Sequence, residues 1–238
     1  MNLDTLLSEK KIKTAVFDID DTVSFTNFVM LYCFLKSRKM KEETRIKKAL
    51  WLAGFISFKV PEYLLLDCID RKYFLGSYVN SFSEFTVEEI DKWSEVYFNS
   101  KIKKLIIPET ERLIRKLKSN GVKVELLSMT LDILASKYAK YFDCPYHALK
   151  TTQKNGHAYV DKSQIRDFKL REVRKFDSGG LLAAADSRHD LPVLRYAQYA
   201  VIVGKDKKKW MDEAGRYLFL HIRSSGQNMT QKLRFVLS

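Results

Sequence analysis

The chain has few cysteines and lacks a long uninterrupted apolar run. Its three cysteines, Cys33, Cys68 and Cys144, are far apart and form no C-x-x-C pair. An odd number at such spacing argues against a disulfide framework and against a zinc site, and it favours a cytoplasmic location. The amino-terminal segment has neither the charged start nor the apolar stretch of a signal peptide. The longest apolar stretch, Ala49–Phe58, is shorter than the roughly 20 residues that cross a bilayer, so we expect no transmembrane segment.

Base-reading motifs are also missing, although the formal net charge of the 238 residues is +13. The lysines are scattered along the chain, so we expect no nucleic-acid partner. A basic surface attracts anionic substrates, and a small phosphate ester is one. The basic and apolar segment Lys47–Phe55 could lie on a membrane surface, but we do not expect peripheral membrane contact. The oligomeric state is left open.

Short apolar runs alternate with helical patterns over the second half of the chain. This order predicts an α/β fold with a doubly wound, mainly parallel, Rossmann-like sheet. Asn155-Gly156, between two short runs, predicts a hairpin. The expected strands are 15–17, 122–127, 147–151, 157–160, 181–185, 199–203 and 217–222, and the expected helices are 131–142, 168–176, 189–197 and 206–214.

Strand signals are missing between Val23 and Val122, where the pattern is helical. The helices expected there are 27–36, 42–58, 61–74 and 86–105, and another from Pro108 to the stop at Asn120-Gly121. Thr86 and Glu89 have the spacing of a capping box. We therefore predict two domains, a core of residues 1–23 and 106–238 and an inserted all-helical domain of residues 24–105. The role of the tail 223–238 is open.

The first apolar run ends in carboxylates, at Asp18, Asp20 and Asp21. Ligands of parallel sheets bind beyond the carboxyl ends of the strands. Asp18 and Asp20 are two residues apart, so they can project to the same side and repel each other. A divalent cation on one carboxylate and a proton on the other would relieve this repulsion, as a nucleophile and a general acid require. The alternative is a loop in which these aspartates cap a turn or helix.

Three later segments have polar residues at comparable places. Ser128 follows the strand 122–127, near a helix start whose backbone N–H groups could hold a phosphoryl oxygen, although it could equally be an ordinary helix cap. Asp186 closes the strand 181–185, and Asp190 lies about one turn further on. Lys169 follows Asp167, an apparent helix cap, and a cation there is unfavourable unless an anion such as a phosphate or Asp190 compensates it.

Taken in order, these segments resemble the haloacid dehalogenase superfamily. The chain is similar to its phosphoserine-phosphatase-like branch with a helical cap (subfamily IB, C1-type) through Ile107–Gly121, Ser128–Thr130, and Asp186-Ser187 with Asp190–Leu194. Asp18-Ile19-Asp20-Asp21-Thr22 resembles the first motif, Ser128 the second, Lys169 the third, and Asp186 with Asp190 the fourth. Two positions depart from the family pattern. Ala185 replaces a glycine, and Asp21 stands where Gly or Ser is usual.

The resemblance implies a Mg²⁺-dependent phosphatase that hydrolyses a small organic phosphomonoester. Asp18 would form an aspartyl phosphate, and Asp20 would protonate the leaving group and then activate water. Mg²⁺ would be held by Asp18, Asp20 through its backbone carbonyl, and Asp186. The phosphate would be bound by Thr22, Ser128, Thr130 and Lys169, with Lys169 oriented by Asp190. Lys162 is a rival for the role of Lys169.

Other functions remain open on these residues. A phosphotransferase or mutase would use the same groups, and a non-catalytic phosphate-binding module could keep the fold. Asp20 argues against carbon–halogen chemistry, because dehalogenases resemble the pattern without the second carboxylate. Phosphoserine is a weaker expectation than another monoester, because the segment after Thr22 offers no acid for an ammonium group. Arg38 or Arg45 could bind a substrate carboxylate.

Overall fold

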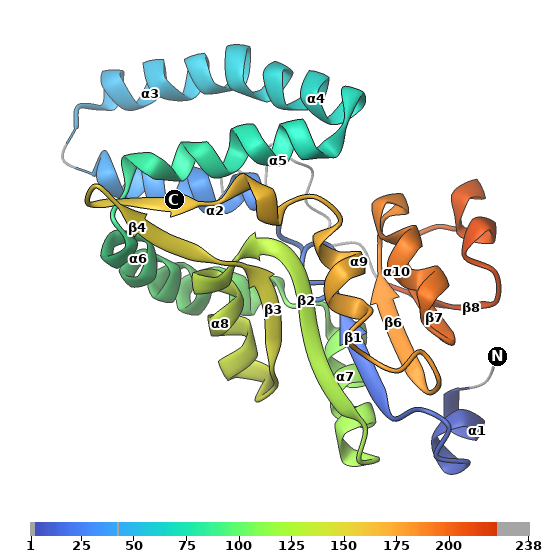
Figure 1. Ribbon diagram of the computed structural model, residues 1–238. Coiled ribbons are helices and arrows are strands. Elements are labelled where there is room, and N and C mark those ends of the chain that lie inside the picture. The colour runs from blue at the N-terminus through green and yellow to red at the C-terminus, as the bar shows by residue number, and fades with distance from the viewer. Residues whose placement is uncertain (1–2, 42, 223–238) are drawn as a thin grey trace.

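A six-stranded parallel sheet forms the centre of the molecule in the computed structural model, which describes residues 3–41 and 43–222 (Figure 1). The spatial order of its strands is β3-β2-β1-β6-β7-β8. The strands are β1 Thr14–Phe17, β2 Lys123–Leu131, β3 Tyr146–Leu149, β6 Leu181–Ala185, β7 Tyr199–Gly204 and β8 Tyr217–His221. This is the predicted doubly wound α/β sheet, and that prediction is confirmed.

The six strands are parallel, and the direction in which successive strands are added to the sheet reverses beside β1. From β1 the chain continues to β2 and β3 on one side, and β6, β7 and β8 follow on the other side. Phe17, the last residue of β1, pairs with both Leu126 and Ala184, so three strands reach the same edge at one level. Ligands of open parallel sheets bind at such a switch point. The carboxylates after β1 and β6 therefore lie where a site is expected.

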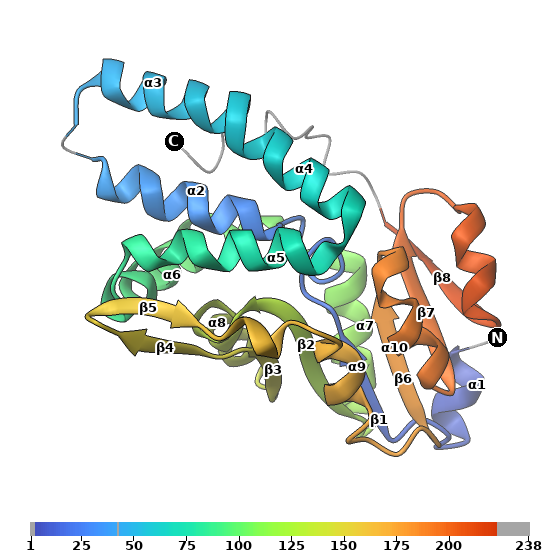
Figure 2. The same ribbon diagram turned by 45° about the horizontal axis from the view of Figure 1, so that its top comes forward.

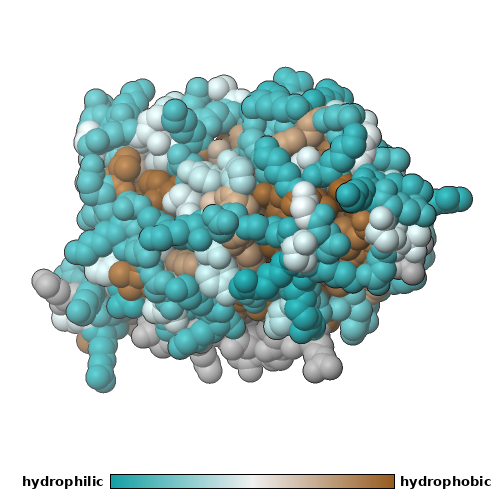
Figure 3. Space-filling model, turned by 90° about the horizontal axis from the view of Figure 1, so that it is seen from below, coloured by the Kyte–Doolittle hydropathy of each residue, from teal (hydrophilic) through white to brown (hydrophobic). Residues whose placement is uncertain are grey.

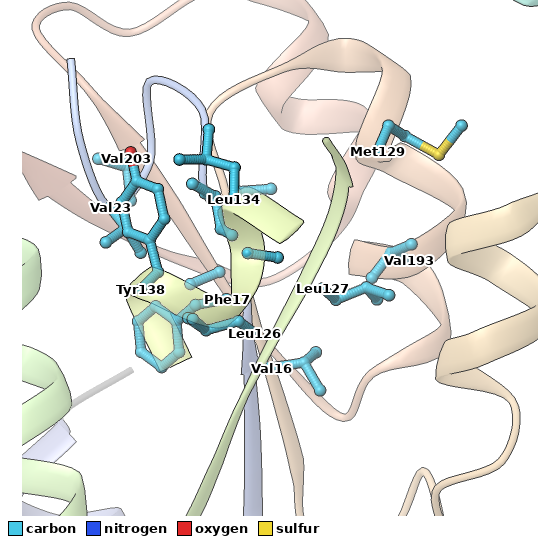
Figure 4. Packing of buried hydrophobic residues seen from close by; sticks show 14 of the residues in the cluster. Val16, Phe17, Val23, Leu126, Leu127, Met129, Leu134, Tyr138, Val193 and Val203 are labelled. Carbon is cyan, nitrogen blue, oxygen red and sulfur yellow. The ribbon is translucent and has the colours of Figure 1, made fainter. Parts of the chain in front are cut away.

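Helices cover both faces of the sheet. Pro108 opens α7 (Pro108–Ser119), which ends as predicted at Asn120-Gly121, and α8 (Asp132–Phe142) packs on β2 and β3. Figure 4 shows Phe17 and Leu126 on the side of Tyr138 in α8, whereas Leu127 points toward Val193 in α10. Alternate strand residues thus fill two apolar layers, as in parallel sheets buried on both faces. The remaining helices of this part are α1 Leu3–Ser8, α9 Phe168–Val173 and α10 Leu191–Tyr196.

Residues 24–105, the helical segment, lie over the carboxyl edge of the sheet (Figures 1 and 2). Its helices are α2 Phe28–Lys39, α3 Arg45–Gly54, α4 Val60–Ile69, α5 Arg71–Asn80 and α6 Val87–Ser100. The two connections to the sheet pair with each other. Phe25 donates its backbone N–H to Leu105 (2.8 Å), and Ile107 donates to Val23 (2.9 Å). The helical segment therefore begins and ends at one narrow, hydrogen-bonded double strand.

The predicted boundary at Pro61 is wrong. Instead of separate helices 42–58 and 61–74, one helix runs from Arg45 to Ile69, and the break falls at Asp70, which accepts from Lys72 N (2.9 Å) to cap α5. A π-helical turn, Phe55–Lys59, precedes α4. Such a turn widens the helix where a proline ring would otherwise meet the preceding carbonyls. From the short apolar stretch Ala49–Phe58 we expected no transmembrane segment. The helix Arg45–Ile69 is nevertheless long and apolar enough to cross a membrane, by length and composition alone.

Other boundaries differ by local geometry. Strand β2 continues past residue 127 to Leu131, the expected helix 206–214 is only the 3₁₀ turn Lys209–Ala214, and the helix from Thr86 ends at Ser100 before the 3₁₀ turn Ile102–Leu105. The expected strand 147–151 is divided between β3 and β4 (Thr151–Lys154), which pairs with β5 (His157–Val160). The Asn155-Gly156 hairpin and the Thr86–Glu89 capping box are confirmed. The tail 223–238 lies outside the described residues.

Candidate active site

Lys169 connects two carboxylates at the carboxyl edge of the sheet. Its Nζ lies 2.7 Å from Asp18 Oδ1 and 2.7 Å from Asp190 Oδ1. Asp18 follows β1 and donates its backbone N–H to Ala184 (2.9 Å), so the parallel ladder fixes its position. Burial alone would lower the pKa of Lys169, but Asp18 and Asp190 raise it above its ordinary value. The ammonium group is therefore charged at neutral pH.

The compensating anion expected for a cation in the first turn of α9 is present. Asp190 is buried and also accepts a hydrogen bond from Ser187 Oγ (2.9 Å), which fixes its carboxylate. Asp167 occupies the N-cap position of α9 as predicted, but its φ is 53° and its side chain makes no cap hydrogen bond. Lys162, the rival lysine, lies exposed in a 3₁₀ turn, and among the described residues it is Lys169 that pairs with Asp18 and Asp190.

Asp18, Asp186 and Asp190 form a carboxylate cluster in which one oxygen atom of each lies within 4.8 Å of the others. Burial raises the pKa of Asp18 to about 6, although Lys169 opposes the shift. Burial and the nearby Asp18 raise the pKa of Asp186 to about 8. Thr22 donates to Asp186 Oδ1 (3.1 Å). One ammonium group does not balance three carboxylates, and hard oxygen ligands of this kind suit Mg²⁺.

The side chain of Asp20 lies in a separate hydroxyl network. Thr26 Oγ1 donates to Asp20 Oδ1 (3.1 Å), and Ser24 Oγ lies 2.7 Å from Thr26 Oγ1 and 2.6 Å from the Tyr138 hydroxyl. Burial, with the charges of Asp18 and Asp21, raises the pKa of Asp20 well above its ordinary value. Asp20 Oδ2 is buried with no protein hydrogen-bond partner. A protonated Asp20 could donate from this oxygen to a substrate atom.

Asp21 explains how the loop tolerates its departure from the family pattern. Its φ is 51°, in the left-handed region that favours glycine, and aspartate is one of the few other residues that adopt it readily. The backbone N–H groups of Thr22, Val23 and Ser24 all point to the Ile19 carbonyl, at 3.3, 2.9 and 3.1 Å. This tight turn directs the chain from β1 into the first connection to the helical segment.

Ser128 and Thr130 are buried in the last part of β2. The pairing of β2 with β3 shifts between Leu127 and Leu131, and Thr130 N donates to Ser128 Oγ (3.1 Å). The expected helix 131–142 is α8, which begins at Asp132, but β2 continues through Ser128 to Leu131, so Ser128 lies within the strand and not beside the helix start. The strand irregularity, rather than a helix terminus, sets the direction of these hydroxyl groups.

A cavity of about 410 Å³ opens beside Lys169 and Asp190. The start of α5 forms its outer wall with Asp70, Arg71 and Lys72. The other lining residues are Leu75, Met129, Ile165, Arg166, Asp167, Phe168, Leu170, His189, Pro192 and Val193. Neither Arg38 nor Arg45 lines this cavity, and the arginines that line it are Arg71 and Arg166.

Sequence reasoning missed Thr26, Tyr138 and Arg71. Thr26 and Tyr138 are 112 residues apart, and they meet because α8 packs beside the connection that contains Thr26. Arg71 enters the cavity wall because the helix before it ends at Ile69 rather than continuing to residue 74. The sequence could have shown this helix start, because aspartate is a favoured N-cap residue and Asp70 directly precedes the helix α5.

The family model described as haloacid dehalogenase-like hydrolase matches residues 15–195. A search of curated proteins found no similar sequence. Among solved structures, the chain is similar to a protein of unknown function from Bordetella pertussis Tohama I, with 11% identity and a TM-score of 0.66, over 88% of this chain and 98% of that one.

Two further structures share the fold. A phosphoserine phosphatase described as a phospho-aspartyl intermediate analogue has 17% identity and a TM-score of 0.59, over 87% of this chain and 93% of that one. A phosphoserine phosphohydrolase-like protein from Francisella tularensis has 15% identity and a TM-score of 0.62, over 87% and 94%. The family match covers Asp18, Ser128, Lys169 and Asp186. The chain therefore belongs to the haloacid dehalogenase-like hydrolases.

Proposed function

We propose that this hydrolase is a Mg²⁺-dependent phosphatase of small organic phosphomonoesters. The observation that supports it best is Lys169 held between Asp18 and Asp190, with Asp186 completing a buried carboxylate cluster. Phosphoryl transfer needs positioning and charge neutralisation more than covalent assistance. One fixed ammonium, several hydroxyl donors and a cation site supply both.

Asp18 acts as the nucleophile in this proposal. Its carboxylate oxygen attacks phosphorus, the bond from phosphorus to the ester oxygen breaks, and the phosphoryl group is bound to Asp18 as an acyl phosphate. Lys169 keeps Asp18 ionised and neutralises charge on the transferring group. A phosphoserine phosphatase with the same fold is described as a phospho-aspartyl intermediate analogue, which supports this route for a related protein.

Asp20 acts as the general acid and then the general base. Its raised pKa favours the protonated form, which gives its proton to the leaving alkoxide. The carboxylate that remains then takes a proton from the water that attacks the acyl phosphate. Thr26 holds Asp20 Oδ1, so the second oxygen is available for these transfers.

The remaining site residues would bind the metal ion and the phosphate group. Asp18, Asp186 and the backbone carbonyl of Asp20 would hold Mg²⁺, which supplies charge neutralisation at the phosphoryl oxygens. Asp190 is also in the carboxylate cluster, but its bonds to Lys169 and Ser187 favour an orienting role. Ser128, Thr130 and Thr22 would donate to the phosphate. The helical segment would act as a cap, closing at its paired connections and excluding water before the leaving group departs.

The substrate would be an anionic monoester whose alcohol part meets Arg71 and Lys72 at the cavity wall. Phosphoserine stays a weaker proposal than another ester. Arg71 could bind its carboxylate, and Asp70 is the acid nearest in sequence for its ammonium group, but Asp70 already caps α5. A cytoplasmic location is supported by three free cysteine thiols. A phosphotransferase would use the same residues and would differ only in the acceptor.

The experiment is turnover of an aryl phosphate with Mg²⁺, with chelator, and by two aspartate variants. Asp18→Asn should abolish turnover while preserving the fold, because the nucleophile is lost without a change in volume. Asp21→Asn is the matched control in the same loop, and asparagine also tolerates a positive φ. Turnover that survives complete chelation, or an Asp18→Asn variant that retains a substantial rate, would refute the proposal. Product alcohol formed without free phosphate would indicate a transferase.

A further inference from the structure

The long helix Arg45–Ile69 has an exposed apolar side, which we call the outer face. Among the described residues, seven of the eleven exposed large apolar side chains belong to this helix, with 48–76% of each exposed. They are Ile46, Leu50, Ile56, Phe58, Leu64, Leu65 and Ile69. Monomeric soluble proteins rarely expose so many large apolar residues on one element, and such surfaces usually mark an interaction site.

The outer face is continuous and lies at the periphery of the molecule. Ile46 and Leu50 are one turn apart on α3, and Leu64, Leu65 and Ile69 continue the exposed side on α4. The opposite side of the helix packs into the core through Phe55 and Tyr63. Figure 2 shows this helix as the outermost layer, beyond α2 and α5. At 1.5 Å per residue, its 25 residues extend over about 38 Å.

Positive charge flanks the amino-terminal half of the outer face. Residues 41–59 contain five Lys and Arg residues and two Glu residues, a surplus of three positive charges. Arg45, Lys47 and Lys59 are exposed on the helix itself. Figure 3 shows the side of the molecule opposite the helical segment, where hydrophilic residues surround a band of apolar residues across the middle. An apolar strip bordered by cations is characteristic of helices that lie in the interface of anionic membranes.

We propose that the outer face docks in the plane of an anionic lipid bilayer. Insertion of the helix across the bilayer is disfavoured, because it would remove Phe55 and Tyr63 from the aromatic core, where Tyr63 contacts Phe74 and Tyr78. Parallel pairing with a second copy is disfavoured because the two basic amino-terminal halves would meet. Anionic lipids supply both the apolar phase and the opposite charge.

Docking would bring the catalytic cavity close to the membrane. Asp70, Arg71 and Lys72 line that cavity and directly follow Ile69 at the end of the docking helix. The cavity wall and the membrane-binding helix are thus parts of one continuous segment. The docking surface itself does not depend on the proposed phosphatase reaction, and it is tested without substrate.

The test is sedimentation of the full chain with sucrose-loaded vesicles, either of pure phosphatidylcholine or with about one third phosphatidylglycerol. We expect binding to the anionic vesicles and at least about tenfold weaker binding of the triple variant Leu50→Ser, Leu64→Ser, Leu65→Ser. Arg45→Glu with Lys47→Glu should weaken binding by a similar factor, and added salt should do the same. Val96→Ser with Tyr159→Ser, exposed apolar residues elsewhere, is the matched control and should bind as the wild type does.

Three outcomes would overturn the proposal. The first is equal vesicle binding by the triple variant and the wild type. The second is a dimer that the triple variant abolishes in a protein that does not bind vesicles. The third is protein that stays with the vesicles after alkaline extraction, since that indicates insertion. Unchanged thermal midpoint and unchanged aryl phosphate turnover of the triple variant show that its fold is intact.

Discussion

Lys169 occupies the first turn of a helix, where a cation is normally unfavourable, and two buried carboxylates stabilise it there. The same contacts define its chemical role. A group that neutralises charge at the reacting centre typically contributes about 10²–10³ in kcat. Lys169→Ala should therefore lower kcat by about this factor, whereas Lys162→Ala should have little effect. Steady-state kinetics of both variants test the assignment, and the reverse ranking would show it to be wrong.

Thr26 opposes the rise in the pKa of Asp20 through one hydrogen bond. Because Thr26 donates to the carboxylate, it favours the ionised form and lowers the pKa of Asp20 against the effect of burial. Thr26→Val keeps the shape and removes the donor, so the alkaline limb of the kcat profile should move to higher pH. Thr152→Val, in the exposed hairpin, is a matched control. An unmoved limb in the Thr26 variant would mean that Asp20 is not the acid.

At the scale of elements, the paired connections make the helical segment a candidate closing cap. Replacing residues 25–103 by a short linker should leave a core that binds Mg²⁺ and cleaves activated aryl phosphates slowly. Discrimination among natural esters should be lost, because Arg71 and Lys72 leave with the segment. The comparison is the spread of kcat/KM over a panel of phosphomonoesters. An unchanged spread in a folded core would assign selection to the β4–β5 hairpin, which contacts the helical segment through the Ala158 to Phe85 hydrogen bond.

The elements show which features a sequence can predict. Asp18 and Asp186 were predictable because strand ends at a parallel sheet edge bring polar residues together. Lys169 was predictable because a cation in the first turn of a helix needs a compensating anion. The helix through Pro61 was not, because its π turn depends on tertiary packing of Phe55 and Tyr63 rather than on local propensity. The contact of Thr26 with Tyr138 joins distant segments, and hydroxyl residues have no distinctive spacing.

At the scale of the whole molecule, the carboxylate cluster links stability to pH and to metal. The folded-state pKa values of Asp18 and Asp186, about 6 and about 8, exceed the ordinary value of 3.8. The folded protein thus holds more protons than the unfolded chain over this range. The stability from these groups is complete below about pH 4 and is lost as the pH rises through 6 and 8.

In the proposed site Mg²⁺ would bind the ionised carboxylates, so its stabilising effect should increase over the same range. We expect the thermal midpoint with Mg²⁺ to exceed that with chelator by more at about pH 8.5 than at about pH 5.5. Asp186→Asn should remove most of this difference. A gain in midpoint that is constant, or that falls with increasing pH, would contradict a metal site at this cluster.

The phosphorylated residue itself is the most direct measure of the central claim, that Asp18 is the nucleophile of a phosphatase. Enzyme mixed with an aryl phosphate and Mg²⁺ is quenched, treated with hydroxylamine, which converts an acyl phosphate to a hydroxamate, and mapped by mass spectrometry. We predict one hydroxamate, on Asp18, that disappears when Mg²⁺ is chelated. A hydroxamate on another carboxylate, or none in an enzyme that is turning over and quenched at saturating substrate, would contradict the account.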